Sequence, residues 1–256
     1  MASSNLRIAF LFIVSIALIS FLITFTLNNN SQAGGLNEKD VNILIGKYIK
    51  ENPKEIIDAL TQYQIDQQKK QEEETSKNIS EKLNEIQNNP LDPIVGNPQG
   101  DIIIAEFFDY SCGYCKKILP SISQLLKNDP NIKVVFKELP ILGPDSYTAA
   151  KAALAVNQIA PEKYFEYHSK LMLGRYRGEA AILKVAEDMG LDKKAVKEKM
   201  NSEQVLSIIT NNKTLSSSIG IRGTPAIVIN DQFFPGAIDL NTFKNIITQI
   251  RSGKDK

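Results

Sequence analysis

The 256-residue sequence has few cysteines and histidines, the usual ligands of zinc, and almost no net charge. It contains two cysteines, one histidine and no tryptophan, and its formal net charge is +1. A structural zinc site needs about four ligands, so two cysteines and the distant His168 argue against one. The balanced charge argues against a nucleic-acid partner or an acidic tail. We therefore expect no metal, no cofactor and no nucleic acid.

Charge is also missing from a stretch near the N-terminus, where Arg7 precedes an uncharged run from Ile8 to Leu27. This run can cross a bilayer at about 1.5 Å per residue and exceeds a signal-peptide core of roughly 7–15 residues. Small residues then occupy the positions that a signal peptidase reads, before and at Ala33. We expect 1–33 to be a signal peptide cleaved near Ala33, or a retained membrane anchor. In either case we expect the rest of the chain to be exported to a compartment where disulfides persist.

The two cysteines lie together as Cys112-Gly113-Tyr114-Cys115. The apolar, β-branched run Ile102–Phe108 before them predicts a buried strand, and apolar residues at helical spacing follow them. Cys112 is therefore expected in the first turn of a helix, where free N–H groups favour a thiolate. Cys115, one turn later, is within disulfide reach. The pattern favours a reversible redox pair over half a zinc site or a structural disulfide, whose short loop would constrain the unfolded chain little.

A polar helical region is expected at 34–96. Helix start signals occur at Asn37 and Asn52, and apolar residues at helical spacing flank a strongly polar stretch around 64–78. So thin an apolar content cannot build a core of its own. We expect a stalk that associates with other copies in a homo-oligomer, with a solvated spacer as the alternative. The apolar stripes are Val41, Leu44, Ile45, Tyr48 and Ile49, then Ile56, Ile57, Leu60 and Tyr63, then Ile79, Leu83 and Ile86.

A single catalytic domain is expected at 97–251, after a helix-breaking stretch that ends at Pro93. Its pattern is a βαβ unit with parallel strands, then a helical insertion at about 144–218, a β-hairpin and a final helix. Residues 252–256 form a tail. The expected elements are a strand at 101–108, a helix at 111–127, a strand at 133–139, hairpin strands at 226–229 and 232–234, and a helix at about 240–250.

This order resembles the DsbA family of exported thiol–disulfide oxidoreductases. The resemblance covers about 97–251 and rests on Glu106-Phe107-Phe108 ahead of Cys112, on the Cys-X-X-Cys motif, and on Gly223-Thr224-Pro225 far downstream. It implies an α/β fold: a thioredoxin-like fold with an inserted helical subdomain, preceded by an N-terminal helical region. That region is similar to the oligomerising stalk of some family members, including trimeric disulfide isomerases.

The resemblance also implies roles for the site residues. Cys112 would be the exposed sulfur that forms the mixed disulfide, and the buried Cys115 would resolve it. Pro225 would be a cis-proline facing the disulfide, with an ordinary trans turn as the alternative. Such a bend lets the backbone of Gly223 and Thr224 pair with an extended substrate.

Three further residues near the cysteines are singled out. Glu106 would be a buried acid that assists proton transfer at Cys115, with a salt bridge to a nearby lysine, Lys116 or Lys117, as the alternative. Gly113 and Tyr114 are expected to contact substrate. Strongly oxidising members carry a histidine where this sequence has Tyr114, and tyrosine offers no imidazolium to stabilise a thiolate. A weaker oxidant is expected.

These observations predict an enzyme that forms or exchanges disulfide bonds in the periplasm. Its expected partners are exported proteins with free thiols or wrong disulfides, and a membrane redox partner that resets the cysteine pair. One alternative is an oligomeric disulfide isomerase or reductase. Another is a non-catalytic peptide-binding chaperone. His168 is expected to be a packing or surface histidine.

Overall fold

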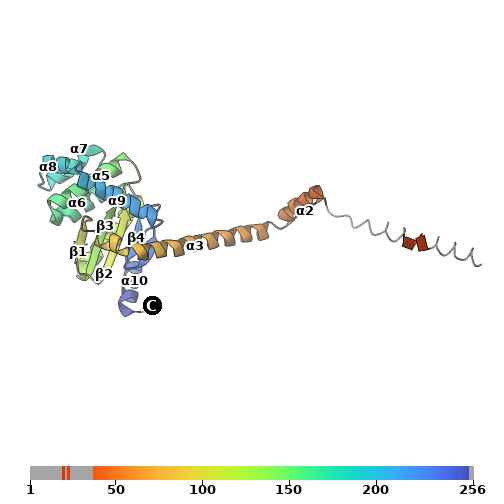
Figure 1. The fold of residues 1–256 in the computed structure, drawn as a ribbon. Helices are drawn as coiled ribbons and strands as arrows, with labels where there is room; N and C mark the ends of the chain where they lie inside the picture. Colours follow the sequence, from red (N-terminus) through yellow and green to blue (C-terminus); the bar gives the residue numbers. More distant parts are fainter. Residues whose placement is uncertain (1–18, 21, 24–36, 254–256) are drawn as a thin grey trace, which may run out of the picture. The chain divides into compact units, whose positions relative to one another are not determined.

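The computed structural model describes residues 19–20, 22–23 and 37–253 and is drawn in Figure 1. It divides into two compact units, Met1–Ile65 and Asp66–Lys256. The signal peptide or anchor expected at 1–33 falls almost wholly outside the described residues. Within the residues that are described, no helix is long and apolar enough to cross a membrane.

The first unit contains helix α2 (Glu38–Glu51) and the start of helix α3 (Pro53–Asn88). As predicted, Asn37 caps α2, because its side chain accepts a hydrogen bond from the Asp40 N–H at 3.0 Å. Asn52 ends α2, and α3 begins at Pro53. The large apolar side chains of this unit are exposed: Val41, Ile43, Leu44, Ile45, Tyr48, Ile49, Ile57, Leu60, Tyr63 and Ile65.

The second unit is built on a five-stranded sheet of order β1-β3-β2-β4-β5. Strands β2 and β3 pair in parallel, as the predicted βαβ unit requires, and the other neighbours pair antiparallel. The strands are β1 (Ile94–Gly96), β2 (Ile102–Phe108), β3 (Ile132–Glu138), β4 (Ala226–Ile229) and β5 (Gln232–Pro235). The sequence pattern did not predict β1, which pairs with β3 at the sheet edge.

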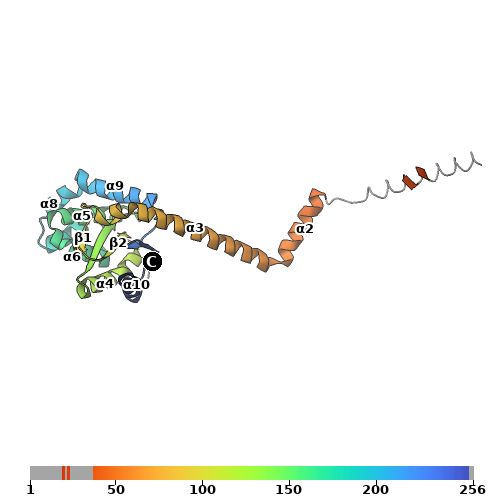
Figure 2. The same ribbon diagram turned by 60° about the horizontal axis from the view of Figure 1, so that its bottom comes forward.

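One face of the sheet carries the larger core. Helices α4 and α10 pack there with helices α5 to α8 of the insertion, which begins at α5 as expected (Figure 2). Alternate strand residues such as Ile104, Phe108 and Phe136 point into this core. The helices are α4 (Gly113–Asn128), α5 (Pro144–Ile159), α6 (Tyr164–Leu173), α7 (Gly178–Asp188), α8 (Lys193–Met200) and α10 (Leu240–Ser252), with a short 3₁₀ turn at Pro161–Lys163.

The opposite face is covered by the second half of α3 and by α9 (Glu203–Ser218). Ile79 and Ile86 are fully buried there, and Leu83 packs beside them. For this stripe the prediction of partners in other copies is wrong, because the sheet of the same chain covers it. The compact unit that contains the sheet therefore begins at Asp66, within the region expected to be a stalk.

Polar contacts fix the end of α3 to the sheet. Lys137 of β3 forms a fully buried ion pair with Asp92 and donates to the carbonyl of Glu85 at 2.9 Å. Gln87 donates to the carbonyl of Asn230 in the β4–β5 turn. The last turns of α3 are thus part of the catalytic unit.

Candidate active site

The two cysteines lie at the start of α4, just beyond the carboxyl end of β2. Cys112 is the N-cap of α4 rather than part of its first turn, and its sulfur accepts a hydrogen bond from the Cys115 N–H at 3.4 Å. Both cysteines are free thiols. The free N–H groups and positive dipole end of a helix stabilise a thiolate at such a position.

The segment before β4 lies directly against Cys112. The Cys112 thiol donates to the carbonyl of Thr224 at 3.2 Å, across 112 positions of sequence. The peptide bond between Thr224 and Pro225 is cis, as predicted. Pro225 is buried and Gly223 is exposed. Because this segment covers the sulfur, Cys112 is only 6% exposed, less than the open position expected for it.

Cys115 and Glu106 form the buried side of the site. Cys115 is 1% exposed, and burial, followed by the charge of Glu106, raises the pKa of its thiol well above the ordinary value. Glu106 is 2% exposed, and burial raises its pKa to about 8. One Glu106 oxygen, Oε1, has no hydrogen-bond partner among the described residues. Two acids that are both uncharged at neutral pH therefore lie within electrostatic range of each other.

The salt bridge considered for Glu106 does not form. The Lys116 ammonium donates to the carbonyl of Gly174 at 3.3 Å. The Lys117 ammonium lies 4.8 Å from the centre of the Tyr114 ring, a cation–π contact at the surface. Glu106 is thus a buried acid with no cation paired to it among the described residues, which is the arrangement that the family resemblance implied.

Gly113 and Tyr114 form the exposed rim between the two cysteines. Tyr114 is 62% exposed, and a Cβ placed on Gly113 would meet no atom within 4 Å. The positions expected to contact substrate are therefore open to a partner. No three histidine, cysteine, aspartate or glutamate side chains converge as metal ligands would in the part of the chain that the structure describes.

Asp109 holds the backbone around the cysteines, and sequence reasoning missed it. The carboxylate is 1% exposed and accepts four hydrogen bonds, from the N–H groups of Ser111, Ile141 and Leu142 and from the hydroxyl of Ser146. These bonds join the segment before Cys112 to the loop after β3. The i to i+2 bond to Ser111 is an Asx turn, a local signal that the sequence offered.

A second missed feature is a buried network on the α6 side of the site. The Tyr110 hydroxyl donates to Glu138 at 3.2 Å and lies 3.1 Å from His168 Nδ1. Burial raises the pKa of Glu138 and lowers that of His168 to about 3, so the imidazole is neutral at pH 7. His168 is thus a packed histidine, stacked with Tyr164. Tyr110 lies 58 positions from His168 in sequence, beyond the reach of any local signal.

Comparison with known proteins identifies the family. The model of the DSBA-like thioredoxin domain matches residues 103–248. The chain belongs to this family. It is 35% identical to the thiol-disulfide exchange protein alpha-DsbA2 from Wolbachia pipientis, with a TM-score of 0.65 over 69% of this chain and 95% of that one.

Two further relatives of this DSBA-like chain are informative. A linker-deletion variant of ScsC from Proteus mirabilis is 26% identical, with a TM-score of 0.65 over 87% of this chain and 98% of that one. Disulfide bond formation protein D from Bacillus subtilis is 24% identical over 63% of this chain and 78% of its own length. The protein is accordingly a thiol–disulfide oxidoreductase with a thioredoxin-like fold.

Proposed function

We propose that this protein is an exported oxidoreductase that forms or exchanges disulfide bonds in secreted proteins through Cys112 and Cys115. The observation that carries the proposal is the contact at 3.2 Å between the Cys112 thiol and the carbonyl of Thr224, next to a cis-proline. This contact places the sulfur of Cys112, the N-cap residue of α4, against a backbone segment that can pair with an extended peptide. Tyr114 and Gly113, both exposed, would form the rim that the substrate crosses.

The proposed reaction starts from the oxidised pair. A substrate thiolate attacks the Cys112 sulfur, the Cys112–Cys115 bond breaks, and Cys115 leaves. A second substrate thiolate then attacks the substrate sulfur of the mixed disulfide and releases Cys112 as a thiolate. Two electrons pass from the substrate dithiol to the enzyme, and the substrate gains one disulfide.

Glu106 supplies the proton that the leaving Cys115 needs. Its raised pKa of about 8 keeps the carboxyl protonated at neutral pH, next to a thiol whose pKa burial also raises. A proton held there neutralises Cys115 as it leaves, and Glu106 can take it back in the reverse direction. This assigns the acid in the apolar strand a positioning and proton-transfer role.

Substrate binding is assigned to the backbone before β4. The N–H groups of Gly223 and Thr224 donate no backbone hydrogen bond to any described residue. They can pair with an extended polypeptide that brings its cysteine to Cys112. Exported proteins with free thiols or wrong disulfides are the proposed substrates.

Export to the periplasm follows from the uncharged run Ile8–Leu27, whether cleaved near Ala33 or retained as an anchor. A membrane redox partner would then return the cysteine pair to its starting state. It would re-oxidise the pair for net disulfide formation, or keep it reduced for isomerisation.

A second candidate, an oligomeric isomerase, is favoured by the exposed apolar residues of α2 and early α3. Monomeric proteins rarely expose so many large apolar side chains together. The match to ScsC, which covers 87% of the chain, extends into these helices. We propose that residues 38–65 associate with other copies. Sedimentation of chains with and without residues 34–65 tests this, and a monomeric full-length chain would contradict it.

The enzymatic proposal is tested with the Cys112→Ser variant. We expect it to lose oxidation of dithiothreitol and rescue of a strain that lacks its own disulfide enzymes. A Cys115→Ser variant should instead accumulate mixed disulfides through Cys112. Unchanged rescue by Cys112→Ser would favour a peptide-binding chaperone and refute the enzyme reading of this site.

A further inference from the structure

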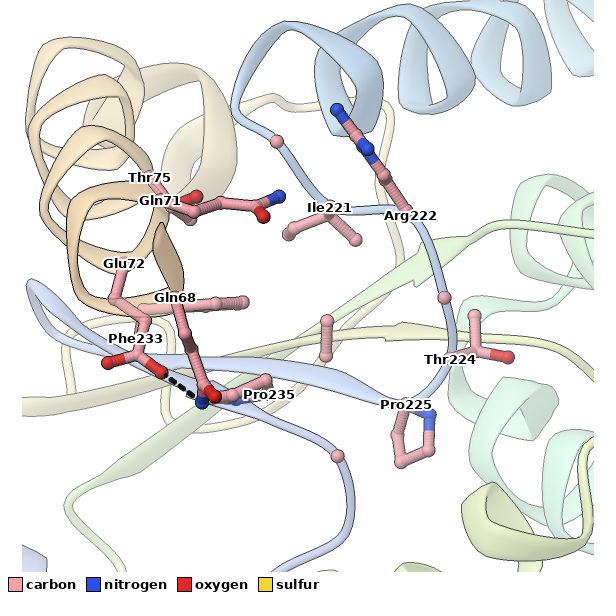
Figure 3. Close-up of a pocket in the computed structure, with 14 residues that line it drawn as sticks. Gln68, Gln71, Glu72, Thr75, Ile221, Arg222, Thr224, Pro225, Phe233 and Pro235 are labelled. Atoms are coloured by element: carbon pink, nitrogen blue, oxygen red, sulfur yellow. Dashed lines mark hydrogen bonds between the residues drawn. The ribbon is translucent and has the colours of Figure 1, made fainter. Parts of the chain in front are cut away.

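A pocket of about 380 Å³ lies beside the cis-proline segment, in the unit Asp66–Lys256 (Figure 3). Gln68, Gln71 and Glu72 of α3 line one wall of it. Pro225 lines another part, so the pocket continues from the segment that contacts Cys112. Its volume lies within the usual range of roughly 300–1,000 Å³ for ligand sites.

The two walls differ in chemistry. The α3 wall is polar, with two amides and the carboxylate of Glu72, which accepts a hydrogen bond from Gln68 at 2.8 Å. The facing wall is apolar and is formed by Ile221, Phe233 and Pro235. In Figure 3 the Glu72 carboxylate lies toward Pro235, whereas the Arg222 side chain points away from it. The end near Pro235 therefore presents an acid above an apolar floor.

The position of α3 against this segment is fixed by close packing. Thr75 is 4% exposed, and a Cβ added to Gly220 would lie 2.8 Å from its hydroxyl oxygen. Gly220 also has a φ of +82°, which favours glycine. The turn of α3 around Thr75, where the buried part of this helix begins, therefore holds the polar wall in place at the pocket.

We propose that this pocket binds a lysine or arginine side chain of the substrate polypeptide, close to its reactive cysteine. A long basic side chain has an apolar stem and a cationic head, which match the Phe233 and Pro235 floor and the Glu72 carboxylate. The substrate backbone would already be paired beside Thr224, so only the neighbouring side chain has to be ordered for it to fill the pocket. The inference rests on the proposed function and adds a substrate preference to it.

Charge-swapped variants test the proposal. The oxidised full-length protein is mixed, as a one-equivalent oxidant, with dithiol peptides that differ only in Lys, Leu or Glu near one cysteine. At low ionic strength we expect the lysine peptide to react about threefold to fivefold faster than the glutamate peptide, a difference that salt reduces because the acid is exposed. Glu72→Lys should reverse this order, and Glu72→Gln should abolish it.

The matched control is Glu73→Lys, one residue along α3, where the side chain is 67% exposed and outside the pocket. It should keep the wild-type order of peptide rates and oxidise dithiothreitol at the wild-type rate. Equal rates for the three peptides, or the same change in Glu72→Lys and Glu73→Lys, would overturn the proposal. A changed oligomeric mass without changed peptide preference would assign the pocket to contact between copies and also overturn it. Loss of dithiothreitol oxidation by the wild type would instead refute the proposed function.

Discussion

Strands β2 and β3 bury ionisable side chains on both faces of the sheet, but the bonding partners of these side chains differ between the two faces. On the face covered by α3 and α9, the Lys137 ammonium pairs with Asp92 and donates to the carbonyl of Glu85. On the face covered by α4 and α6, Glu106 and Glu138 are 2% and 0% exposed and form no ion pair among the described residues.

The ion pair on one face stabilises the fold, whereas an unpaired acid on the other face can take part in proton transfer. A buried charge is tolerable when a partner neutralises it, whereas a buried acid without a cation stays protonated at a cost in stability. The paired charges join β3 to the end of α3. The unpaired Glu106 lies on the face of Cys115, where a neutral acid can exchange a proton with a thiol. The unpaired Glu106 thus lies on the face where the proposed function needs a buried acid.

The paired face predicts the largest effect. Lys137→Met leaves Asp92 buried without its cation, and breaking a buried pair costs about 3–5 kcal/mol. We expect a loss of this size in the free energy of unfolding, measured with urea. The folded fraction should retain dithiothreitol oxidation. Lys137→Met combined with Asp92→Leu should recover most of the stability, since two apolar residues replace the pair. A single variant as stable as wild type would contradict this role.

The unpaired Glu106 on the other face predicts a loss of stability as the pH rises. Burial raises the pKa of Glu106 from 4.5 to about 8. The protonated carboxyl therefore contributes its full stability below pH 4.5 and loses it as pH rises through about 8. Comparing pH 5 with pH 9, Glu106→Gln should lose about 2–4 kcal/mol less than wild type. Parallel curves for the two proteins, measured by denaturant unfolding, would contradict the raised pKa.

The same substitution should slow catalysis below pH 8. Without a proton donor, departure of Cys115 during mixed-disulfide formation should slow by about 10–100-fold at pH 7, near the lower end of general-acid effects. Above the Glu106 pKa the wild type loses this advantage, so the two rates should converge. Stopped-flow oxidation of a dithiol peptide across pH 6–10 (roughly the range that brackets this group) measures it. A constant ratio would argue for a purely structural role.

The smallest expected effect lies at the exposed rim, where charge is solvated. Tyr114→His places an imidazole beside Cys112, and its cationic form favours the thiolate. We expect a reduction potential higher by up to about 30 mV, or 1.4 kcal/mol for a two-electron couple. Equilibration with glutathione measures it, and Tyr114→Phe is the control with little change. A lower potential in Tyr114→His would contradict the role assigned to this position.

Local patterns in the sequence predicted most of the fold. The β-branched run before Cys112 and the cap at Asn37 marked the start of the βαβ unit and of α2, because each signal spans only a few residues. Strand β1 escaped, since three residues show no alternation. The α3 stripe of Ile79 and Ile86 was visible, but periodicity says that a face is apolar and not what covers it.

Sequence reasoning likewise found some residues of the candidate site and missed others. Cys112, Cys115 and the cis bond before Pro225 stood out through motif and family resemblance. The network of Tyr110, His168 and Glu138 did not, because its members are brought together by the fold across 28 and 58 positions. No spacing rule connects a residue of the active-site segment with one in α6.

The edges of the sheet have a consequence for the proposed action on unfolded chains. Open strand edges invite pairing with other extended polypeptides, and short strands or prolines discourage it. Here β1 has three residues, and the four-residue β5 ends at Pro235. An unfolded substrate would thus find little to pair with along either edge. The N–H groups of Gly223 and Thr224, which donate no backbone hydrogen bond to any described residue, would be the preferred place to add a strand. The sheet would bind its proposed substrates beside Cys112 and resist aggregation with them along its two edges.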